Sequence, residues 1–308
     1  YPNELTTEEC YKFLDDVASF SNPIMIMTGG EPMLRDDIWD IAKYGTKLGL
    51  RMVMAPCGFL VTEETARKMI ESGIQRVSFS IDGATAESHD NFRRVKGAFA
   101  SVMQAIESVK KVGLPFQVNT TITKHNLAEL PKILELVISL GAVAHHPFLL
   151  VPTGRGAQLK DQEISPEEYE KSLSWFHEMR DKVPLQFKPT CAPHYYRIFR
   201  QKEREKGVTV TPETHGLDAM SKGCMGGQSF AFVSNTGKVQ ICGFLDVECG
   251  DIRKEPFHTI WDTSKVFQEM RHWDDYNGRC GYCEFRKVCG GCRARAFAFT
   301  GNYMDEEP

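Results

Sequence analysis

The stretch IMIMTGGEPMLRDDI, residues 24–38, joins an apolar strand-like run to the start of a helix through the paired glycines Gly29 and Gly30. Glycine lets the backbone approach a ligand more closely than bulkier residues do. Because the turn follows a strand, its N–H groups and the side chain of Glu31 are expected at the carboxyl end of a parallel sheet. Taken alone, the motif is equally compatible with an ordinary tight turn before a helix.

Strand and helix signals alternate on both sides of this stretch. Between the apolar runs, apolar residues recur every three or four positions, and two such helical patterns end at Gly113 and Gly141, where a C-terminal cap is expected. This alternation is typical of a parallel sheet covered by helices, so an α/β partial barrel is predicted. The predicted strands are residues 24–28, 52–55, 77–81, 116–122 and 146–151.

Three regions follow from these patterns. Residues 1–183 are predicted to form the barrel, which opens on a helix at residues 6–20, so that the strand expected before it is missing. Residues 184–222 are rich in proline and aromatic residues and are predicted to connect two domains. In residues 223–308 the alternation of strand and helix signals stops, and short strands, glycines and cysteines take its place, which indicates a small second domain.

Composition excludes several classes of protein. The chain has 308 residues and a formal net charge of −4, so no basic face is expected to bind nucleic acid. No apolar run is long enough to span a membrane, and no signal-peptide pattern is present. We therefore expect a cytoplasmic globular protein. Since the chain starts at Tyr1 and not at Met, we also expect it to be a fragment of something longer.

The cysteines are unevenly placed. Of ten, seven lie after residue 223, and two pairs have C-x2-C spacing, which brings thiolates together through one tight turn. Clustered cysteines of this kind in a cytoplasmic protein indicate metal binding more than disulfides. Spacing alone leaves structural zinc and iron–sulfur clusters as equal alternatives. The predicted ligands are Cys224, Cys242, Cys249, Cys280, Cys283, Cys289 and Cys292.

Polar side chains at the ends of two further strands complete the pattern. Ser80 and Asp82 end one strand and Asn119 lies in the next, with side chains suited to a ribose or an amino-acid group. With Gly29, Gly30 and Glu31 they share the carboxyl ends of the strands, the functional face of a β/α barrel.

Together these residues resemble the radical S-adenosylmethionine enzymes with a C-terminal SPASM domain, over essentially the whole chain. The resemblance implies a partial (β/α)6 barrel followed by a small cysteine-rich SPASM-type domain with one or two auxiliary 4Fe-4S clusters. It also implies that Cys224, Cys242 and Cys292, with Cys249 as a further candidate, hold one cluster, while Cys280, Cys283 and Cys289 hold another. Spacing by itself would instead group residues 280, 283, 289 and 292. The residues implied to bind S-adenosylmethionine are Gly29, Gly30, Glu31, Pro32, Ser80, Asp82, Arg93 and Asn119.

Two parts of the family pattern are absent from the sequence. The C-x3-C-x2-C motif, which holds the 4Fe-4S cluster that cleaves S-adenosylmethionine, should precede the first helix, and a final cysteine should follow Cys292. We expect both to lie outside these 308 residues; the alternative is a degenerate, non-catalytic relative. The last gap of the SPASM motif, between Cys289 and Cys292, also has two residues where the family has three.

Within the family, residues 54–60, 145–156, 187–198 and 223–244 resemble the branch that acts on iron tetrapyrroles. The resemblance implies oxidative decarboxylation of two propionates of Fe-coproporphyrin III to vinyl groups, with electrons from a small donor such as ferredoxin or flavodoxin. Three alternatives stay open: deacetylation of didecarboxysiroheme or side-chain chemistry toward heme d1, a peptide-modifying SPASM maturase, and a non-catalytic zinc-binding protein.

A substrate with four carboxylates on a flat ring needs cations, hydroxyls and aromatic groups together. The residues predicted to contact it are Arg155, His194, Tyr195, Arg197, Cys57 and Cys191. Residues 187–198 could equally be an aromatic-rich linker, and a buried neutral thiol is the commonest role for Cys57 and Cys191. His145 and His146 are interpreted as structural, and Cys10 as an inert thiol on an outer helix.

Overall fold

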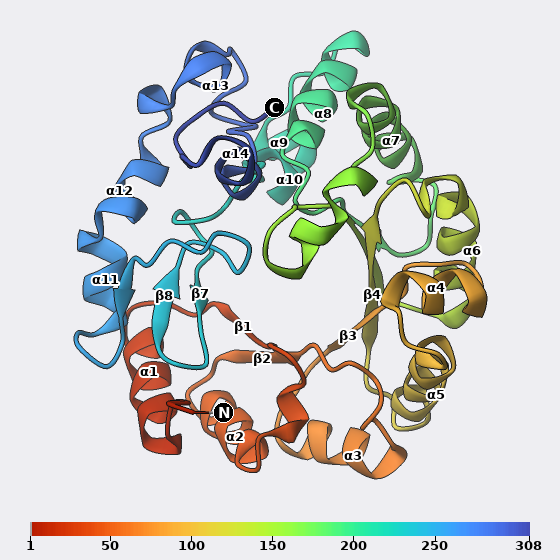
Figure 1. The fold of residues 1–308 in the computed structure, drawn as a ribbon, viewed down its shortest axis with the longest axis vertical. Helices are drawn as coiled ribbons and strands as arrows, with labels where there is room; N and C mark the ends of the chain where they lie inside the picture. Colours follow the sequence, from red (N-terminus) through yellow and green to blue (C-terminus); the bar gives the residue numbers. More distant parts are fainter. Residues whose placement is uncertain (1) are drawn as a thin grey trace.

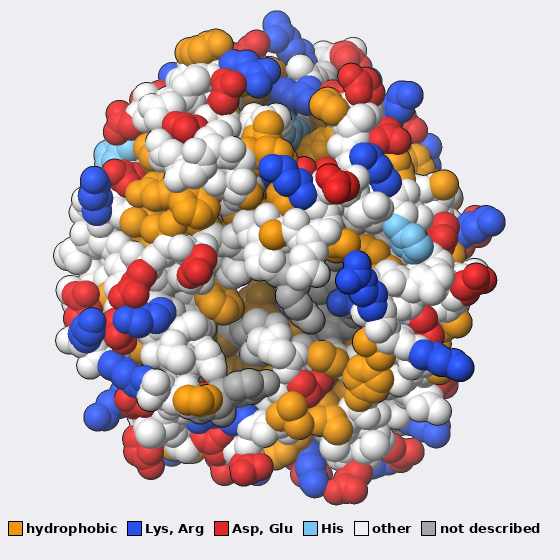
Figure 2. Space-filling view, in the orientation of Figure 1, with side chains coloured by type: hydrophobic (Ala, Val, Ile, Leu, Met, Phe, Trp, Pro, Cys, Tyr) orange, Lys and Arg blue, Asp and Glu red, His pale blue; other side chains and the backbone are white. Residues whose placement is uncertain are grey.

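The computed structural model describes residues 2–308, except for the side chains of Arg155 and Leu217. Its elements form a ring, in which a parallel sheet and its helices occupy one part and the cysteine-rich C-terminal region the rest (Figure 1). Figure 2 shows that this face of the molecule is hollowed near its middle. In the described part of the chain no helix is both long enough and apolar enough to cross a bilayer.

Six parallel strands form the main sheet in the order of the sequence, β1 to β6. This is the predicted α/β partial barrel. The ends of the five predicted strands are confirmed to within two residues, and those of β4 agree with the prediction at both ends. The structure adds a sixth strand, β6, which was not predicted. The strands are β1 (Ile24–Met27), β2 (Arg51–Met54), β3 (Val77–Ser80), β4 (Phe116–Ile122), β5 (Ala144–Leu149) and β6 (Gln186–Phe187).

The helices of the barrel half follow the strands and cover the outside of the sheet (Figure 1). Their ends agree with local signals: α6 ends at Gly141, whose φ of 82° is left-handed, and α1 begins at a capping box formed by Thr6 and Glu9. The helices are α1 (Thr7–Phe20), η1 (Pro32–Leu34), α2 (Ile38–Lys47), α3 (Glu63–Glu71), α4 (Ala86–Arg93), α5 (Ala98–Lys111), η2 (Leu127–Glu129), α6 (Leu130–Leu140), η3 (Gly154–Gln162), α7 (Pro166–Met179) and α8 (His194–Glu205).

Strand residues alternate between the core and the inside of the barrel. Along β4 every second residue is buried, and Val118 on this strand and Phe79 on β3 are at most 1 % exposed. Their side chains belong to the apolar core between the sheet and the helices. The intervening polar residues, including Ser80 and Asn119, therefore face the barrel interior.

The C-terminal region is built differently. Its three short strands form an antiparallel sheet in the order β7-β8-β9, and helices and loops surround it. The elements are α9 (Pro212–His215), α10 (Leu217–Met220), β7 (Phe232–Val233), β8 (Lys238–Gln240), β9 (Gly250–Asp251), α11 (Phe257–Thr263), α12 (Lys265–Arg271), η4 (Trp273–Asp275), α13 (Gly278–Tyr282) and α14 (Arg293–Thr300).

This region packs on the barrel near both edges of the parallel sheet. Beside β1, Arg253 forms an ion pair with Glu9 of α1, and the rings of Phe13 and Phe257 meet edge to face. Beside β5 and β6, the guanidinium of Arg295 on α14 donates to the carbonyl of Leu150. The C-terminal region therefore closes the ring that the six strands leave open.

The boundary predicted at residue 183 divides the sheet itself. Strand β6 lies in the segment predicted to be a connection, yet it pairs with β5 in parallel. A two-residue strand between prolines carries no periodic signal, so only its pairing with β5 identifies it.

Candidate functional site

The glycine turn after β1 is tied to the loop after β2. The carboxylate of Glu31 accepts hydrogen bonds from the backbone N–H of Met33 (3.0 Å) and of Cys57 (2.7 Å). The Cys57 thiol in turn donates to the carbonyl of Gly30 (3.1 Å). Gly29 has a φ of 134°, which disfavours residues with a side chain. The predicted residues Gly29, Gly30, Glu31 and Cys57 are thus brought together at the carboxyl ends of neighbouring strands.

A row of polar side chains crosses the inside of the barrel. Ser80 on β3 is the register partner of Asn119 on β4, and Asn119 is the partner of His146 on β5. The side-chain amide of Gln117 links the Asn119 oxygen (3.1 Å) to a ring nitrogen of His146 (3.4 Å). The other ring nitrogen of His146, Nε2, is buried and has no partner among the described residues. The row presents neutral donors and acceptors to the interior.

The two adjacent histidines face opposite ways. His145 packs on the outer side, where its Nε2 meets the Thr120 hydroxyl (2.9 Å) and its ring lies against Phe187. Burial lowers the pKa of His145 to about 3 and that of His146 to about 4, so both rings are neutral near pH 7. His145 is structural, as interpreted, whereas His146 belongs to the interior row.

Asp82 and Arg93 form an anchored pair beyond the end of β3. The carboxylate of Asp82 is fully buried, accepts the N–H of Thr121 (2.7 Å) and is bound by two guanidinium nitrogens of Arg93, both at 2.5 Å. The Arg93 side chain remains 36 % exposed. Asp82 is therefore too buried to contact a ligand itself, but it fixes the position of Arg93, whose guanidinium is partly exposed.

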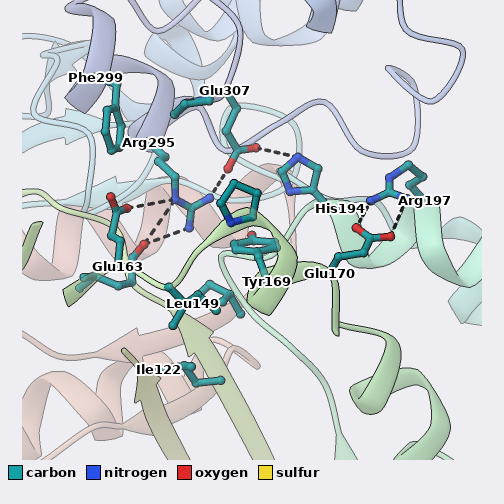
Figure 3. Close-up of a pocket in the computed structure, with 14 residues that line it drawn as sticks. Ile122, Leu149, Glu163, Tyr169, Glu170, His194, Arg197, Arg295, Phe299 and Glu307 are labelled. Carbon is teal, nitrogen blue, oxygen red and sulfur yellow. Dashed lines mark hydrogen bonds and ion pairs between the residues drawn. The ribbon is translucent and has the colours of Figure 1, made fainter. Parts of the chain in front are cut away.

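A cavity of about 430 Å³ lies where α14 meets the ends of β4 and β5. Figure 3 shows Arg295 and Glu307 on one side, with Tyr169 and His194 facing them and the apolar Leu149 and Ile122 below. The hydroxyl of Tyr169 and the Nδ1 of His194 are buried without a partner among the described residues. They are groups through which the cavity could bind a polar ligand.

Glu307 joins the residues on one wall of this cavity. Its carboxylate accepts the backbone N–H of Cys292 (2.6 Å), pairs with Arg295 and lies 3.6 Å from Nε2 of His194. Burial alone would raise the pKa of Glu307, but Arg295 and then His194 bring it below its ordinary value. Arg295 also donates to the carbonyls of Leu150 and Cys191 and lies 3.9 Å from a Glu163 oxygen. Its guanidinium is therefore satisfied within the protein.

The predicted substrate contacts are not all at one place. His194 lines the cavity, and Arg197 lies at its rim, where Glu170 binds it through two oxygens, at 2.5 Å and 3.1 Å (Figure 3). Tyr195 is buried against Tyr196, and burial raises its pKa to about 12. The side chain of Arg155 lies outside the described residues. Cys191 follows β6, and its carbonyl accepts a hydrogen bond from Arg295 (3.1 Å).

Of the seven C-terminal cysteines, Cys292 is buried and the other six are half-buried. Burial is the largest cause that raises the pKa of Cys242 to about 11 and that of Cys292 to about 12, and the Cys224 thiol adds to both shifts. Burial likewise raises the pKa of Cys289 to about 12, with contributions from Cys280 and Cys283. We call Cys224, Cys242 and Cys292 the first thiol group, and Cys280, Cys283 and Cys289 the second. This division is the interleaved pairing that the resemblance implies, and it stays a prediction.

The donor set fits an iron–sulfur cluster. The Cys280 sulfur accepts hydrogen bonds from Arg293 (3.4 Å) and from the Glu307 N–H (3.5 Å), and such donors stabilise thiolate ligands. Within residues 2–308 as described, no three His, Cys, Asp or Glu side chains converge on a single metal ion.

Several functional candidates escaped sequence reasoning. His146 could have been found from strand parity, because it is the register partner of Asn119 on the neighbouring strand and so lies on the same face of the sheet. Tyr169, Arg295 and Glu307 carry no such signal. They come from α7, α14 and the chain end, and only the packing of the two halves brings them to one cavity.

Sequence models of two known families match the two halves of the chain. The sequence model described as "Radical SAM superfamily" matches residues 1–137, and the one described as "Iron-sulfur cluster-binding domain" (SPASM) matches residues 224–292. The second match starts and ends on cysteines of the first thiol group. It does not include Cys191.

Individual proteins are similar over nearly the whole chain. The chain is 52% identical to the AdoMet-dependent heme synthase of Methanosarcina barkeri, covering 99% of this chain and 87% of that protein. It is 29% identical to the Fe-coproporphyrin III synthase of the same organism, covering 100% and 80%. Among solved structures, Streptococcus suis SuiB bound to S-adenosylmethionine superimposes with a TM-score of 0.75 at 12% identity, covering 100% and 70%. The structural likeness confirms the fold alone.

Proposed function

Because the chain belongs to the radical SAM enzymes with a SPASM domain, and among them to the AdoMet-dependent heme synthases, we propose that it converts Fe-coproporphyrin III to heme b. Each of two propionates loses a hydrogen atom from its β-carbon, carbon dioxide and one electron, and becomes a vinyl group. The observation that carries this proposal is 52% identity across 99% of the chain. The lower identity of 29% to the Fe-coproporphyrin III synthase disfavours the deacetylation alternative.

S-adenosylmethionine is proposed to bind at the carboxyl ends of β1, β3 and β4. Gly29 and Gly30 offer exposed backbone, Ser80 and Asn119 offer neutral polar groups on one face, and Arg93 offers its exposed guanidinium. A guanidinium suits the methionine carboxylate because it can donate two parallel hydrogen bonds. Glu31 keeps the glycine turn against the loop after β2, and Pro32 fixes the start of η1.

The two thiol groups are proposed to hold auxiliary 4Fe-4S clusters. When bound, such a cluster supplies a redox centre that can accept or relay the electron released in the reaction. The chain's own residues would exclude water from the sulfurs and donate hydrogen bonds to them, as Arg293 does to Cys280. A small electron donor such as ferredoxin or flavodoxin is the proposed partner.

The tetrapyrrole is not expected to fill the cavity of Figure 3 by itself. Its charged lining comprises Glu163, Glu170, Glu307, Arg197 and Arg295, so carboxylates outnumber guanidiniums, which disfavours a ligand with four carboxylates. Figure 2 shows a hollow near the middle of this face of the molecule, and we propose that the ring binds there. We propose that His194 contacts its carboxylates and that Cys57 lies close to the ring; Arg155, whose side chain is outside the described residues, stays a predicted contact.

The test is anaerobic turnover of the protein expressed from its native gene, with S-adenosylmethionine and reduced flavodoxin. Fe-coproporphyrin III and didecarboxysiroheme are offered separately, and the products are read by mass. The proposal expects two successive losses of a carboxyl group plus one hydrogen from Fe-coproporphyrin III. Loss of acetate groups from didecarboxysiroheme instead would assign the protein to the alternative reaction. A colourless, iron-free protein would favour the zinc-binding alternative.

A further inference from the structure

The parallel sheet carries positive charge that no carboxylate of its own strands balances. None of the six strands β1 to β6 contains an Asp or a Glu. Three basic residues with long side chains lie in these strands or directly beside them: Arg51, Arg76 and Lys188. The helices cover the outside of the strands, so a side chain on the other face of the sheet points toward the middle of the molecule, where Figure 2 shows a hollow.

Strand alternation puts Arg51 and Arg76 on this inward face. Along β2 the residues Met52 and Met54 are buried in the core, so Arg51, the first residue of the strand, points away from the core. Arg76 comes directly before β3, and its carbonyl accepts the N–H of Met54 (3.1 Å), which extends the pairing of the two strands by one residue. Because Ser78 faces inward, Arg76, two residues earlier, faces inward as well.

Lys188 reaches the same face from the other edge of the sheet. Phe187, the last residue of β6, is buried in the core. The N–H of Lys188 donates to the carbonyl of His145 (3.1 Å), so the pairing of β5 with β6 continues by one residue and sets Lys188 beside His146. Since successive strand residues point to opposite sides, Lys188 points inward, as His146 does.

We call Arg51, Arg76 and Lys188 the inner cations. Among the described residues, none of their side chains has an ion pair or a hydrogen bond. This is unlike Arg35, whose guanidinium binds both carboxylate oxygens of Asp37. Arg51 and Lys188 are exposed and Arg76 is half-buried, so a ligand in the interior could reach all three.

The inner cations also act on one another and on His146. Burial and then the charge of Arg51 lower the pKa of Arg76. Burial and then the charges of Lys188 and Arg76 lower the pKa of His146. A curved sheet turns its inward side chains toward one another, which agrees with these effects. An anion placed among like charges of this kind would be attracted by each of them.

Two of the inner cations lie far from the residues proposed to bind S-adenosylmethionine. Arg76 is four residues before Ser80, which is roughly 13 Å along the strand at a rise of about 3.3 Å per residue. Arg51 likewise stands at the amino end of β2, whereas the glycine turn follows the carboxyl end of β1. A carboxylate bound to these arginines would therefore lie away from the carbon atom that reacts.

We propose that the inner cations bind the two propionates of Fe-coproporphyrin III that do not react. The inference rests on the proposed decarboxylation and adds to it the site that decides which propionates are kept. A guanidinium can bind a carboxylate through two parallel hydrogen bonds, and the lysine adds a third positive charge. The reacting propionates then point toward the carboxyl ends of the strands, beside S-adenosylmethionine.

The experiment compares the binding of two iron porphyrins to the protein expressed from its native gene and purified without oxygen. Fe-coproporphyrin III carries four propionates, whereas heme b keeps only the two that do not react. Each is titrated by absorption into wild type, Arg51→Gln, Arg76→Gln, Arg76→Lys and Lys188→Gln, with circular dichroism to check folding. Arg67→Gln is the matched control, because Arg67 pairs with Glu63 on the outer helix α3.

We expect Arg51→Gln and Arg76→Gln to weaken both porphyrins by the same factor, about ten- to a hundredfold. Lys188→Gln should weaken both by a smaller factor, and Arg76→Lys should recover part of the loss. The control should bind both porphyrins as wild type does. Equal losses for the two ligands would support the assignment, because they share only the unreacting pair of propionates.

Two results would overturn it. A loss confined to Fe-coproporphyrin III would mean that the inner cations hold the reacting propionates, and unchanged binding of both ligands would mean that they hold no carboxylate. Neither result affects the proposed reaction, which is judged separately by the masses of the wild-type products. If wild type makes no heme b from Fe-coproporphyrin III, the proposed function is wrong and the assignment of the unreacting propionates falls with it.

Discussion

Replacing Glu307 tests whether the end of the chain holds the cysteine-rich half to the barrel. Its carboxylate is buried, accepts the Cys292 N–H and pairs with the buried guanidinium of Arg295. In Glu307→Ala that guanidinium loses its main counter-charge, since Glu163 is 3.9 Å away and the remaining acceptors are carbonyls. Breaking one side of a buried ion pair costs about 3–5 kcal/mol, so unfolding should require that much less free energy.

Glu307→Gln separates the charge from the hydrogen bond. Its amide oxygen can still accept the Cys292 N–H, so we expect a smaller loss of about 1–3 kcal/mol. Urea unfolding of the anaerobically purified protein, followed by circular dichroism, measures both variants. Glu306→Ala is the matched control, because Glu306 is the neighbouring glutamate and binds Arg279 at the surface, so its removal should change stability much less than either replacement of Glu307.

The pH dependence gives an independent check. The folded-state pKa of Glu307 lies below its ordinary value of 4.5, so the carboxylate contributes stability above the unfolded pKa and loses it as pH falls through the folded pKa. Wild type should therefore lose its advantage over Glu307→Gln as the pH falls below about 4.5. If wild type and Glu307→Gln unfold alike at neutral pH, or if Glu307→Ala is as stable as Glu306→Ala, Glu307 does not stabilise the contact between the two halves as described.

Three further predictions concern other parts of the site. Arg93→Lys should weaken S-adenosylmethionine binding about tenfold, equivalent to about 1.4 kcal/mol, in calorimetry, and the exposed neighbour in Arg94→Lys should not. Arg197→Ala should reduce Fe-coproporphyrin III binding by less than about threefold in an absorption titration, because its guanidinium is already paired; a hundredfold loss would restore it as a propionate contact. Gly223→Ala should lower the iron content, since the added methyl would collide with the Cys289 carbonyl; unchanged iron and stability would contradict the close packing there.

The sequence by itself determined the barrel half. Strands such as β4 and helices such as α6 are marked by local periodicity and by glycines at their ends, and these signals agree with the parallel sheet. The residues after strand ends could be placed at one edge because all carboxyl ends of parallel strands meet there. Hence Gly29, Glu31, Ser80 and Asn119 were predicted, and the structure brings them to that edge.

Only the tertiary structure decided how the two halves meet. Whether Arg197 is free or paired depends on Glu170, which lies on another helix, and which cysteines are neighbours depends on loops far apart in the chain. The position of Cys292 also depends on long-range contacts, because its N–H donates to the Glu307 carboxylate and Arg295, on the helix that follows it, donates to the Leu150 carbonyl of the barrel. Local sequence records the periodicity of one element at a time, whereas these contacts arise from long-range burial and ion pairing, which leave no periodic trace in the chain.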